Sequence, residues 1–414
     1  MKEELHLFII WENARNKQEE IVNDIKEKFE IINIYDMNWS KNKFSNNLSR
    51  FYGTNLPDGS AKEQHCGNGK FLLIIVKDTN PQYEERMTSK GPKIVNINMF
   101  DKKELYRKNT GGGHKIHATN DEKETNHDIT LLLGKNVEDY KHENQEKWNG
   151  KIEDINLDLF GCDGWNSVEK MFYVLNNCTN YAILRNYESL PDEIYQNDHN
   201  DIDLICESLQ DTAYVLNAEP VFKEDYRVHY KTNVEDRIAY FDLRFVGDDY
   251  YYLNIEKDIL NNRIFNEKGF FTLNKEDYFY TLLYHALIQK PEFKKDYKLK
   301  LRDMNIETLK EEETIEKYSD VLKKWMLKKE YIITEPKDKS VAFNIQHAQL
   351  FEPFIYKSNK EEEYKEKINE LKKENNEQKE RILELTRVLE GIQCSRTWKI
   401  TEPIRKLKKK FSRG

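Results

Sequence analysis

The segment that most constrains the fold is DIDLIC at residues 201–206, in which polar and apolar side chains alternate. This period of two is typical of a β-strand, because successive side chains point to opposite faces of a sheet. Asp201 and Asp203 would then project together, while Ile202 and Leu204 pack on the other face. Two neighbouring carboxylates repel unless a cation lies between them, so the pair indicates a metal site or a solvated strand edge.

A second strand-like segment, RIAYFDLRF at residues 237–245, carries Asp242 between two apolar residues. Two or three converging carboxylates can hold Mg²⁺ or Mn²⁺, which bridges phosphate oxygens and stabilises charge as a phosphoryl group is displaced. The sequence therefore predicts Asp201, Asp203 and Asp242 as catalytic residues and metal ligands, with Mg²⁺ or Mn²⁺ as the cofactor.

The order of these elements resembles the nucleotidyltransferase fold: a strand at residues 181–185, a loop, the DIDLI strand, and an aspartate on a later strand. The stretch YAILRNYESLP followed by DIDLI is similar to members of that superfamily from bacterial surface-polysaccharide pathways, loosely the LicD/fukutin group. The resemblance covers about residues 166–300. It implies transfer of a phospho-alkyl, phospho-sugar or nucleotidyl group from a nucleotide-linked donor, preferably of CDP type, to a capsule or lipopolysaccharide glycan.

One pair of residues departs from that superfamily pattern. Arg185–Asn186 stands where the pattern has Gly-Ser or Gly-Gly, whose small size lets phosphates approach the backbone. Arg185 is predicted to bind a phosphate through its guanidinium fork. The alternatives are that Arg185 forms a salt bridge with a nearby carboxylate, and that the site has lost nucleotide binding.

A glycine- and histidine-rich segment occupies residues 109–134. Three consecutive glycines favour a loop whose backbone approaches a ligand closely, and a helix start is predicted just beyond it, near Thr125 or Asn126. A helix N-terminus beside such a loop is suited to anions. The predicted substrate- or phosphate-binding residues are Gly111, Gly112, Gly113, His114, Lys115 and His117. A zinc site, a histidine acting as general base or phospho-acceptor, and a structural loop are the alternatives.

The predicted fold class is α/β and α+β in four parts. Residues 1–150 form an N-terminal α/β domain, and residues 151–355 form a nucleotidyltransferase-like mixed-sheet domain with a helical extension. Residues 356–393 form a coiled-coil helix, and residues 394–414 form a basic amphipathic tail.

The coiled-coil prediction depends on apolar residues at alternating spacings of four and three. They are Tyr364, Ile368, Leu371, Ile382, Leu385, Leu389 and Ile392. Asn375 and Gln378 occupy the two seam positions between them, which weakens the seam and can set its register. We expect a homo-oligomer; a single solvated helix packed on its own domain is the alternative.

The C-terminal segment SRTWKITEPIRKLKKKFSRG, residues 395–414, combines basic with aromatic and aliphatic side chains. Such a segment suits an anionic membrane surface. It resembles the S-x-[ST]-W-[RK]-[IL]-T-x-P-[LI]-R tail of many bacterial glycosyltransferases and capsule or lipopolysaccharide enzymes. The resemblance implies a place at the inner membrane face; an ordinary basic tail is the alternative.

The composition limits the expected partners and the expected cellular location. A net charge of −8 argues against a nucleic-acid partner. Five scattered cysteines without a CxxC pair indicate a reducing cytoplasm. No apolar stretch approaches the roughly 20 residues of a membrane span, and the first residues lack the features of a signal peptide. The expected location is cytoplasmic and peripheral at the inner membrane face.

Two other functions are compatible with the sequence. The N-terminal domain could be a kinase or phosphotransferase that uses the GGGH loop, with a degenerate second domain. The chain could instead be a non-enzymatic scaffold of a polysaccharide synthase complex.

Overall fold

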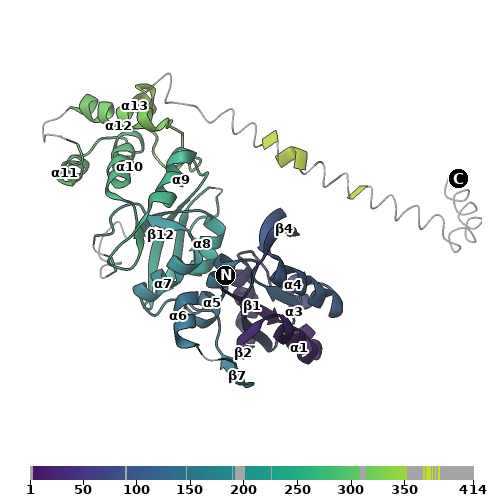
Figure 1. The fold of residues 1–414 in the computed structure, drawn as a ribbon. Coiled ribbons are helices and arrows are strands. Elements are labelled where there is room, and N and C mark those ends of the chain that lie inside the picture. The colour runs from purple at the N-terminus through teal and green to yellow at the C-terminus, as the bar shows by residue number, and fades with distance from the viewer. Residues whose placement is uncertain are drawn as a thin grey trace, which may run out of the picture. The chain divides into compact units, whose positions relative to one another are not determined.

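A computed structural model describes residues 3–88, 91–145, 147–188, 190–191, 201–224, 226–307 and 314–351, and ten residues between 367 and 382 (Figure 1). The chain divides into two compact units, Met1–Tyr356 and Lys357–Gly414. The mixed α/β class predicted from the sequence is confirmed. In the part that the structure describes, no helix has the length and apolarity needed to cross a membrane.

The N-terminal region is built on a five-stranded sheet in the order β6-β1-β3-β2-β7. The edge strand β7 lies just after residue 150, the boundary expected from the sequence. Its strands are β1 (Glu4–Ile10), β2 (Glu30–Asn38), β3 (Phe71–Asp78), β6 (Ile116–Ala118) and β7 (Ile152–Asn156). All neighbours are antiparallel except β2 and β7. A separate hairpin joins β4 (Tyr83–Thr88) to β5 (Gly91–Asn96).

Both faces of this sheet are covered, which explains why β1 and β3 are apolar along most of their length. Phe8 and Ile74 pack on one face with α1 (Gln18–Lys28) and α4 (Ile97–Asn109). Leu7 and Ile75 pack on the other face with α5 (Glu122–Leu133).

The second region, residues 151–351, is built on a seven-stranded sheet in the order β10-β11-β12-β9-β8-β14-β13. The strands are β8 (Tyr181–Ile183), β9 (Asp201–Cys206), β10 (Glu219–Pro220), β11 (His229–Val234), β12 (Arg237–Phe245), β13 (Ile264–Phe265) and β14 (Phe271–Thr272). Two pairs are parallel, β9 with β12 and β8 with β14, and the other neighbours are antiparallel. The three strands expected from the sequence are therefore adjacent.

Helices surround the two sheets. The remaining ones are η1 (Glu12–Lys17), η2 (Lys41–Lys43), α2 (Phe44–Tyr52), α3 (Ala61–Cys66), α6 (Val137–Glu143), α7 (Val168–Cys178), α8 (Leu209–Leu216), α9 (Leu253–Asn262), α10 (Lys275–Ile288), α11 (Lys295–Met304), α12 (Ile315–Lys329) and α13 (Ile345–Gln349). On the second sheet, Ile183 and Leu204 share a core with α7 and α8, whereas Ala182 and Ile205 share one with α9, α10 and α12. Asp201 and Asp203 alternate with Ile202 and Leu204, so they belong to the face covered by the later helices.

One hydrophobic core joins the N-terminal and second regions, because a single cluster of buried side chains runs from Leu7 to Leu243. Arg50 on α2 strengthens the junction. Its buried guanidinium donates to the carbonyls of Phe160, Tyr214 and Val215. Burial lowers the pKa of Arg50 to about 10. Residues 3–351 are therefore one packed body.

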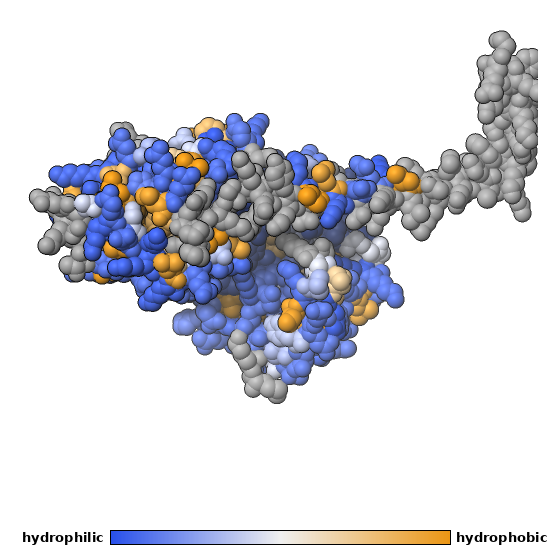
Figure 2. Space-filling view, turned by 90° about the horizontal axis from the view of Figure 1, so that it is seen from above, coloured by the Kyte–Doolittle hydropathy of each residue, from blue (hydrophilic) through white to orange (hydrophobic). Residues whose placement is uncertain are grey.

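On the face shown in Figure 2, the coloured surface is largely hydrophilic, and apolar residues form small, separate groups. The described residues of the segment 367–382 are helical, and Ile368, Leu371 and Ile382 are 50–63% exposed. The other apolar seam positions and the tail 394–414 lie outside the described residues. Self-association through this helix stays a prediction.

Candidate functional site

The sheet brings the predicted carboxylates together. In the parallel register of β9 and β12, Asp242 lies opposite Asp203. Ligand atoms of Asp201 and Asp242 also lie within 4.8 Å of each other and of a ring nitrogen of His229. We call Asp201, His229 and Asp242 the aspartate cluster.

His229 was not predicted, and the turn that aligns it lacks the Asn-Gly or Asp-Gly sequence typical of such hairpins. A two-residue turn at Glu235 and Asp236, with φ of 51° and 60°, joins β11 to β12. Positive φ at both central residues is the geometry of a type I′ hairpin, which fixes the register of its strands. Counting back from this turn places His229 opposite Asp242.

The aspartate cluster contains polar atoms with unused hydrogen-bonding capacity. His229 Nδ1 and Asp242 Oδ1 are 3.1 Å apart, but their orientation is not that of a hydrogen bond. Both atoms are buried and have no hydrogen-bond partner among the described residues. Such orphaned atoms are costly unless a ligand satisfies them. Two carboxylates and an imidazole fit a divalent cation, and the nitrogen ligand suits Mn²⁺ better than Mg²⁺.

Asp203 has a different partner. Its Oδ1 accepts a hydrogen bond from Arg185 Nη2 at 2.7 Å, and the two side chains are only 11% and 10% exposed. Burial raises the pKa of Asp203; Asp242 and Asp201 add to this effect, and Arg185 opposes it. The structure thus shows the salt-bridge alternative for Arg185. Arg185 therefore pairs with Asp203, and the atoms that could still bind a metal are those of the aspartate cluster.

Asn186 explains how the chain turns without the small residues of the superfamily pattern. Its φ is 57°, in the left-handed region that asparagine tolerates better than most residues. Its Oδ1 accepts a hydrogen bond from Lys300 Nζ at 3.0 Å. The chain therefore turns after β8 as it would with a glycine, although Asn186 adds a side chain at a position where the superfamily pattern has glycine or serine.

Two cationic groups lie around the aspartate cluster, Arg244 on β12 and Lys290 just after α10. Arg244 Nη2 lies 3.5 Å from Asp242 Oδ2, while its Nη1 lies 3.2 Å from Asp338 Oδ2. Lys290, just after α10, is half-buried. Burial and then Arg185 lower its pKa, and Asp203 and Asp201 oppose this. Arg244 lies two residues after Asp242 on β12, so strand alternation places it on the same face. Lys290 was missed because only the tertiary structure brings its segment to the sheet. Positive groups so placed can stabilise charge on phosphate oxygens.

The glycine loop lies at the end of α4 and not beside the start of α5. The amides of Gly111 and Gly112 donate to the carbonyls of Lys108 and Arg107, at 3.2 and 2.7 Å. All three glycines have φ near 80°, as is common where a helix ends. The loop therefore follows a helix C-terminus in the chain, whereas the sequence suggested a loop that leads into a helix N-terminus.

The predicted start of the following helix is also wrong. Helix α5 begins at Glu122, because Asp121 caps it by accepting a hydrogen bond from the Glu124 amide. Thr125 and Asn126, the expected caps, lie inside the helix. The helix starts earlier because Asp121, a strongly preferred N-cap residue, precedes both of them in the chain.

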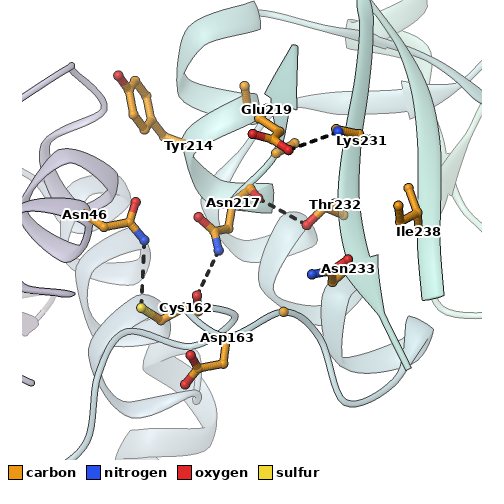
Figure 3. A pocket seen from close by; sticks show the side chains of 13 residues that line it. Asn46, Cys162, Asp163, Tyr214, Asn217, Glu219, Lys231, Thr232, Asn233 and Ile238 are labelled. Carbon is orange, nitrogen blue, oxygen red and sulfur yellow. Dashed lines mark hydrogen bonds and ion pairs between the residues drawn. The ribbon is translucent and has the colours of Figure 1, made fainter. Parts of the chain in front are cut away.

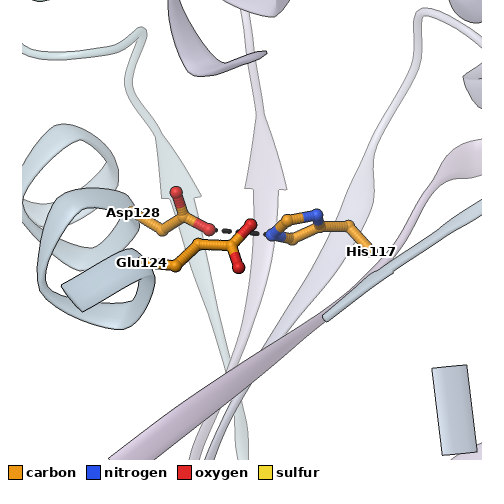
Figure 4. A group of neighbouring side chains, drawn as sticks. All are labelled: His117, Glu124 and Asp128. Atoms are coloured by element: carbon orange, nitrogen blue, oxygen red, sulfur yellow. Dashed lines mark hydrogen bonds and ion pairs between the residues drawn. The ribbon is translucent and has the colours of Figure 1, made fainter. Parts of the chain in front are cut away.

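A second side-chain group consists of His117, Glu124 and Asp128, which we call the His117 cluster. Figure 4 shows the two carboxylates projecting from α5 toward the histidine. Asp128 accepts hydrogen bonds from His117 Nε2 at 2.8 Å and from His127 Nδ1 at 2.9 Å. Burial opposes the ionisation of Asp128, but these two hydrogen bonds hold its pKa below the usual value.

A pocket of about 560 Å³ lies between α2, the end of α8 and the β11–β12 hairpin (Figure 3). Its polar side chains are largely occupied with one another. Asn217 Nδ2 donates to the Cys162 carbonyl at 3.0 Å, and Lys231 pairs with Glu219 at 3.2 Å. None of the predicted site residues lines this pocket.

Comparisons of the chain with family models, curated proteins and solved structures gave no match. The geometry of the two side-chain clusters is therefore the basis for assigning a function.

Proposed function

We propose that the second region is a metal-dependent transferase. It moves a phospho-alkyl, phospho-sugar or nucleotidyl group from a nucleotide-linked donor, preferably of CDP type, to a bacterial capsule or lipopolysaccharide glycan. The observation that carries the proposal is the aspartate cluster, in which a buried nitrogen and a buried oxygen on adjacent strands, 3.1 Å apart, have no hydrogen-bond partner among the described residues. The order α7, β8, β9 and β12 supports the resemblance to the nucleotidyltransferase fold.

Each side chain has a role in this proposal. Asp201, Asp242 and His229 hold Mn²⁺ or Mg²⁺, which supplies Lewis-acid stabilisation of phosphate charge when bound. Arg244 holds Asp242 in place from its buried position between Asp242 and Asp338.

Donor binding is assigned to the cations around the cluster. Lys290 makes no ion pair with a described carboxylate, so its ammonium is available to a phosphate. Arg185 is already paired with Asp203, which we assign as a positioning residue because it orients this guanidinium. A donor phosphate would share the Arg185 fork with Asp203, since a guanidinium has five donors.

The proposal extends to location and assembly. The C-terminal tail would hold the enzyme at the cytoplasmic face of the inner membrane, near membrane-linked glycan acceptors. The helix within residues 361–392 would pair two or more copies. Both roles belong to segments that lie mostly outside the described residues.

A thermal-shift panel tests the assignment. CTP, a CDP-alditol, a UDP-sugar and ATP would each be added with Mn²⁺ or Mg²⁺ to the wild type and to Asp201→Ala/Asp242→Ala. We expect stabilisation that needs both metal and cytidine nucleotide and that disappears in the double variant. Asp101→Ala/Asp303→Ala is the matched control, because it removes two exposed carboxylates and should behave as wild type.

Two results would contradict the proposal. Stabilisation that survives the double substitution would move nucleotide binding to the N-terminal region, as in a kinase or phosphotransferase. No stabilisation by any nucleotide would favour a scaffold.

A further inference from the structure

The histidine of the His117 cluster has one occupied and one open ring nitrogen. Asp128 is an acceptor, so the proton of the pair lies on His117 Nε2. His117 Nδ1 makes no hydrogen bond with a described residue and is not among the buried atoms that lack a partner. The His117 side chain is 8% exposed, and the hydrogen bond to Asp128 leaves the lone pair on Nδ1 and fixes the orientation of the ring.

The His117 cluster differs from a metal centre in its hydrogen bonding. Asp128 uses both oxygens to accept from histidines. Glu124 Oε2 accepts from the Asn120 amide and side chain, each at 2.7 Å. Because these acceptors are satisfied within the protein, the cluster is complete without a cation.

Lys62 and two further histidines lie near His117. The rings of His65 and His114 are 5.6 Å apart, and Lys62 Nζ lies 3.1 Å from the centre of the Tyr52 ring. The Tyr52 ring is in turn 5.7 Å from that of His117. Burial lowers the pKa of His114, and the next causes are Lys62, Arg107 and His65, all cationic or basic. The local field favours an anion.

The last amides of the glycine loop lie near these basic side chains. The amides of Gly113 and His114 donate to no acceptor in the part of the chain that the structure describes. A Cβ at Gly113 would lie 3.0 Å from the His65 ring, whereas one at Gly112 would meet only open space. Successive backbone amides in such a turn form a concavity that binds anionic groups.

We propose that the N-terminal region carries a second ligand site, for a small phosphorylated molecule that also has a hydroxyl group. The loop amides of Gly113 and His114, with His65 and Lys62, bind the phosphate. His117 Nδ1 accepts a hydrogen bond from the hydroxyl and thereby orients the ligand. This site is independent of the aspartate cluster and of the transferase activity proposed for it.

Histidine-selective ¹⁵N NMR on the full chain tests the site, with glycerol 3-phosphate and methyl phosphate as probes. Both carry a phosphate, but only glycerol 3-phosphate has hydroxyl groups. We expect both probes to shift the His65 and His114 signals saturably, and only glycerol 3-phosphate to shift His117 Nδ1. His65→Ala/His114→Ala should weaken both probes at least about tenfold, since charge-assisted contacts are lost.

Controls separate this site from the other cluster. Asp201→Ala/Asp242→Ala should leave both affinities unchanged, and His117→Ala should weaken glycerol 3-phosphate only. The proposal is overturned if neither phosphate shifts His114 saturably, or if the His65→Ala/His114→Ala variant binds as wild type. It is also overturned if Mn²⁺ at micromolar concentration selectively broadens the His117 signals, which would make the cluster a metal site.

Discussion

The aspartate cluster and the His117 cluster contain the same types of residue but use their hydrogen-bonding groups differently. In the aspartate cluster, His229 Nδ1 and Asp242 Oδ1 are buried and make no hydrogen bond within the part of the chain that the structure describes. In the His117 cluster, both oxygens of Asp128 accept hydrogen bonds. A histidine beside two carboxylates therefore does not define a metal site; what matters is whether the protein already satisfies the ligand atoms.

The backbone explains this difference. The aspartate cluster is assembled on adjacent strands, where directly opposed residues are held about 5 Å apart and their side chains share a face. In the His117 cluster the two carboxylates lie one turn apart on α5, close to the loop that supplies Asn120 as a donor. Asp128 accepts from His117 on β6 and from His127 on α5, and Glu124 accepts from Asn120 in the preceding loop, so these carboxylates have donors that the aspartate cluster lacks.

The largest expected effect on stability comes from breaking the ion pair between Arg185 and Asp203, which distinguishes Asp203 from the aspartate cluster. Arg185→Met should lower the free energy of unfolding by about 4 kcal/mol, because it leaves a buried carboxylate without its partner. Urea denaturation measures this change. Arg185→Met/Asp203→Asn should recover most of the loss; if it does not, the guanidinium contributes by packing and not by pairing.

Metal affinity separates the two clusters directly. Asp242→Ala should weaken Mn²⁺ binding by at least about 100-fold, which corresponds to roughly 2.7 kcal/mol, because a ligand is removed. Asp128→Ala should leave the Mn²⁺ affinity unchanged. Isothermal titration calorimetry measures both. Equal weakening by the two substitutions would show that the clusters do not differ as described.

Asp128→Asn should lower the free energy of unfolding by about 2 kcal/mol, since one of two buried hydrogen bonds to a charged group is replaced by an opposed donor. Glu124→Gln at a less buried position is the matched control and should cost about 0.5 kcal/mol. Urea denaturation near neutral pH compares them. A larger loss in the control would mean that Glu124, and not Asp128, is the anchor of the cluster.

The smallest effect is a contrast in pH dependence between the two regions. Burial raises the pKa of Asp248, to about 6, and that of Glu256, which accepts from the Gly247 amide. Acids with a raised folded pKa stabilise the fold below their unfolded pKa and lose this contribution as pH rises through the folded value. Asp128, whose pKa is lowered, behaves oppositely and loses its contribution as pH falls.

Urea denaturation between about pH 2 and 8 measures that contrast. Glu256→Gln should flatten the decline of stability between pH 5 and 7 by about 1 kcal/mol. Asp128→Asn should instead reduce the acid sensitivity below pH 4.5. An unchanged slope in Glu256→Gln would exclude the buried pair as its origin.

The candidate site was partly accessible from the sequence. Alternation in DIDLIC placed Asp201 and Asp203 on one strand face, and the apolar neighbours of Asp242 placed it on another strand. His229 had no such signal, because the Glu235–Asp236 turn lacks the glycine-containing sequence typical of a type I′ hairpin. Arg244 lies two residues after Asp242 on β12, so strand alternation could have placed it on the same face. Lys290 and Asp338 carry no comparable local signal, because only the tertiary structure brings their segments to the sheet.

The sequence by itself determined the mixed α/β class, the central strands and the aspartates, since strand periodicity and side-chain chemistry are local properties. The tertiary structure alone decided that Arg185 pairs with Asp203, and that the glycine loop ends α4. It also decided which histidine meets which carboxylate. Those outcomes depend on register and on packing between residues far apart in the chain, where many near-equal alternatives compete and only the folded core selects one.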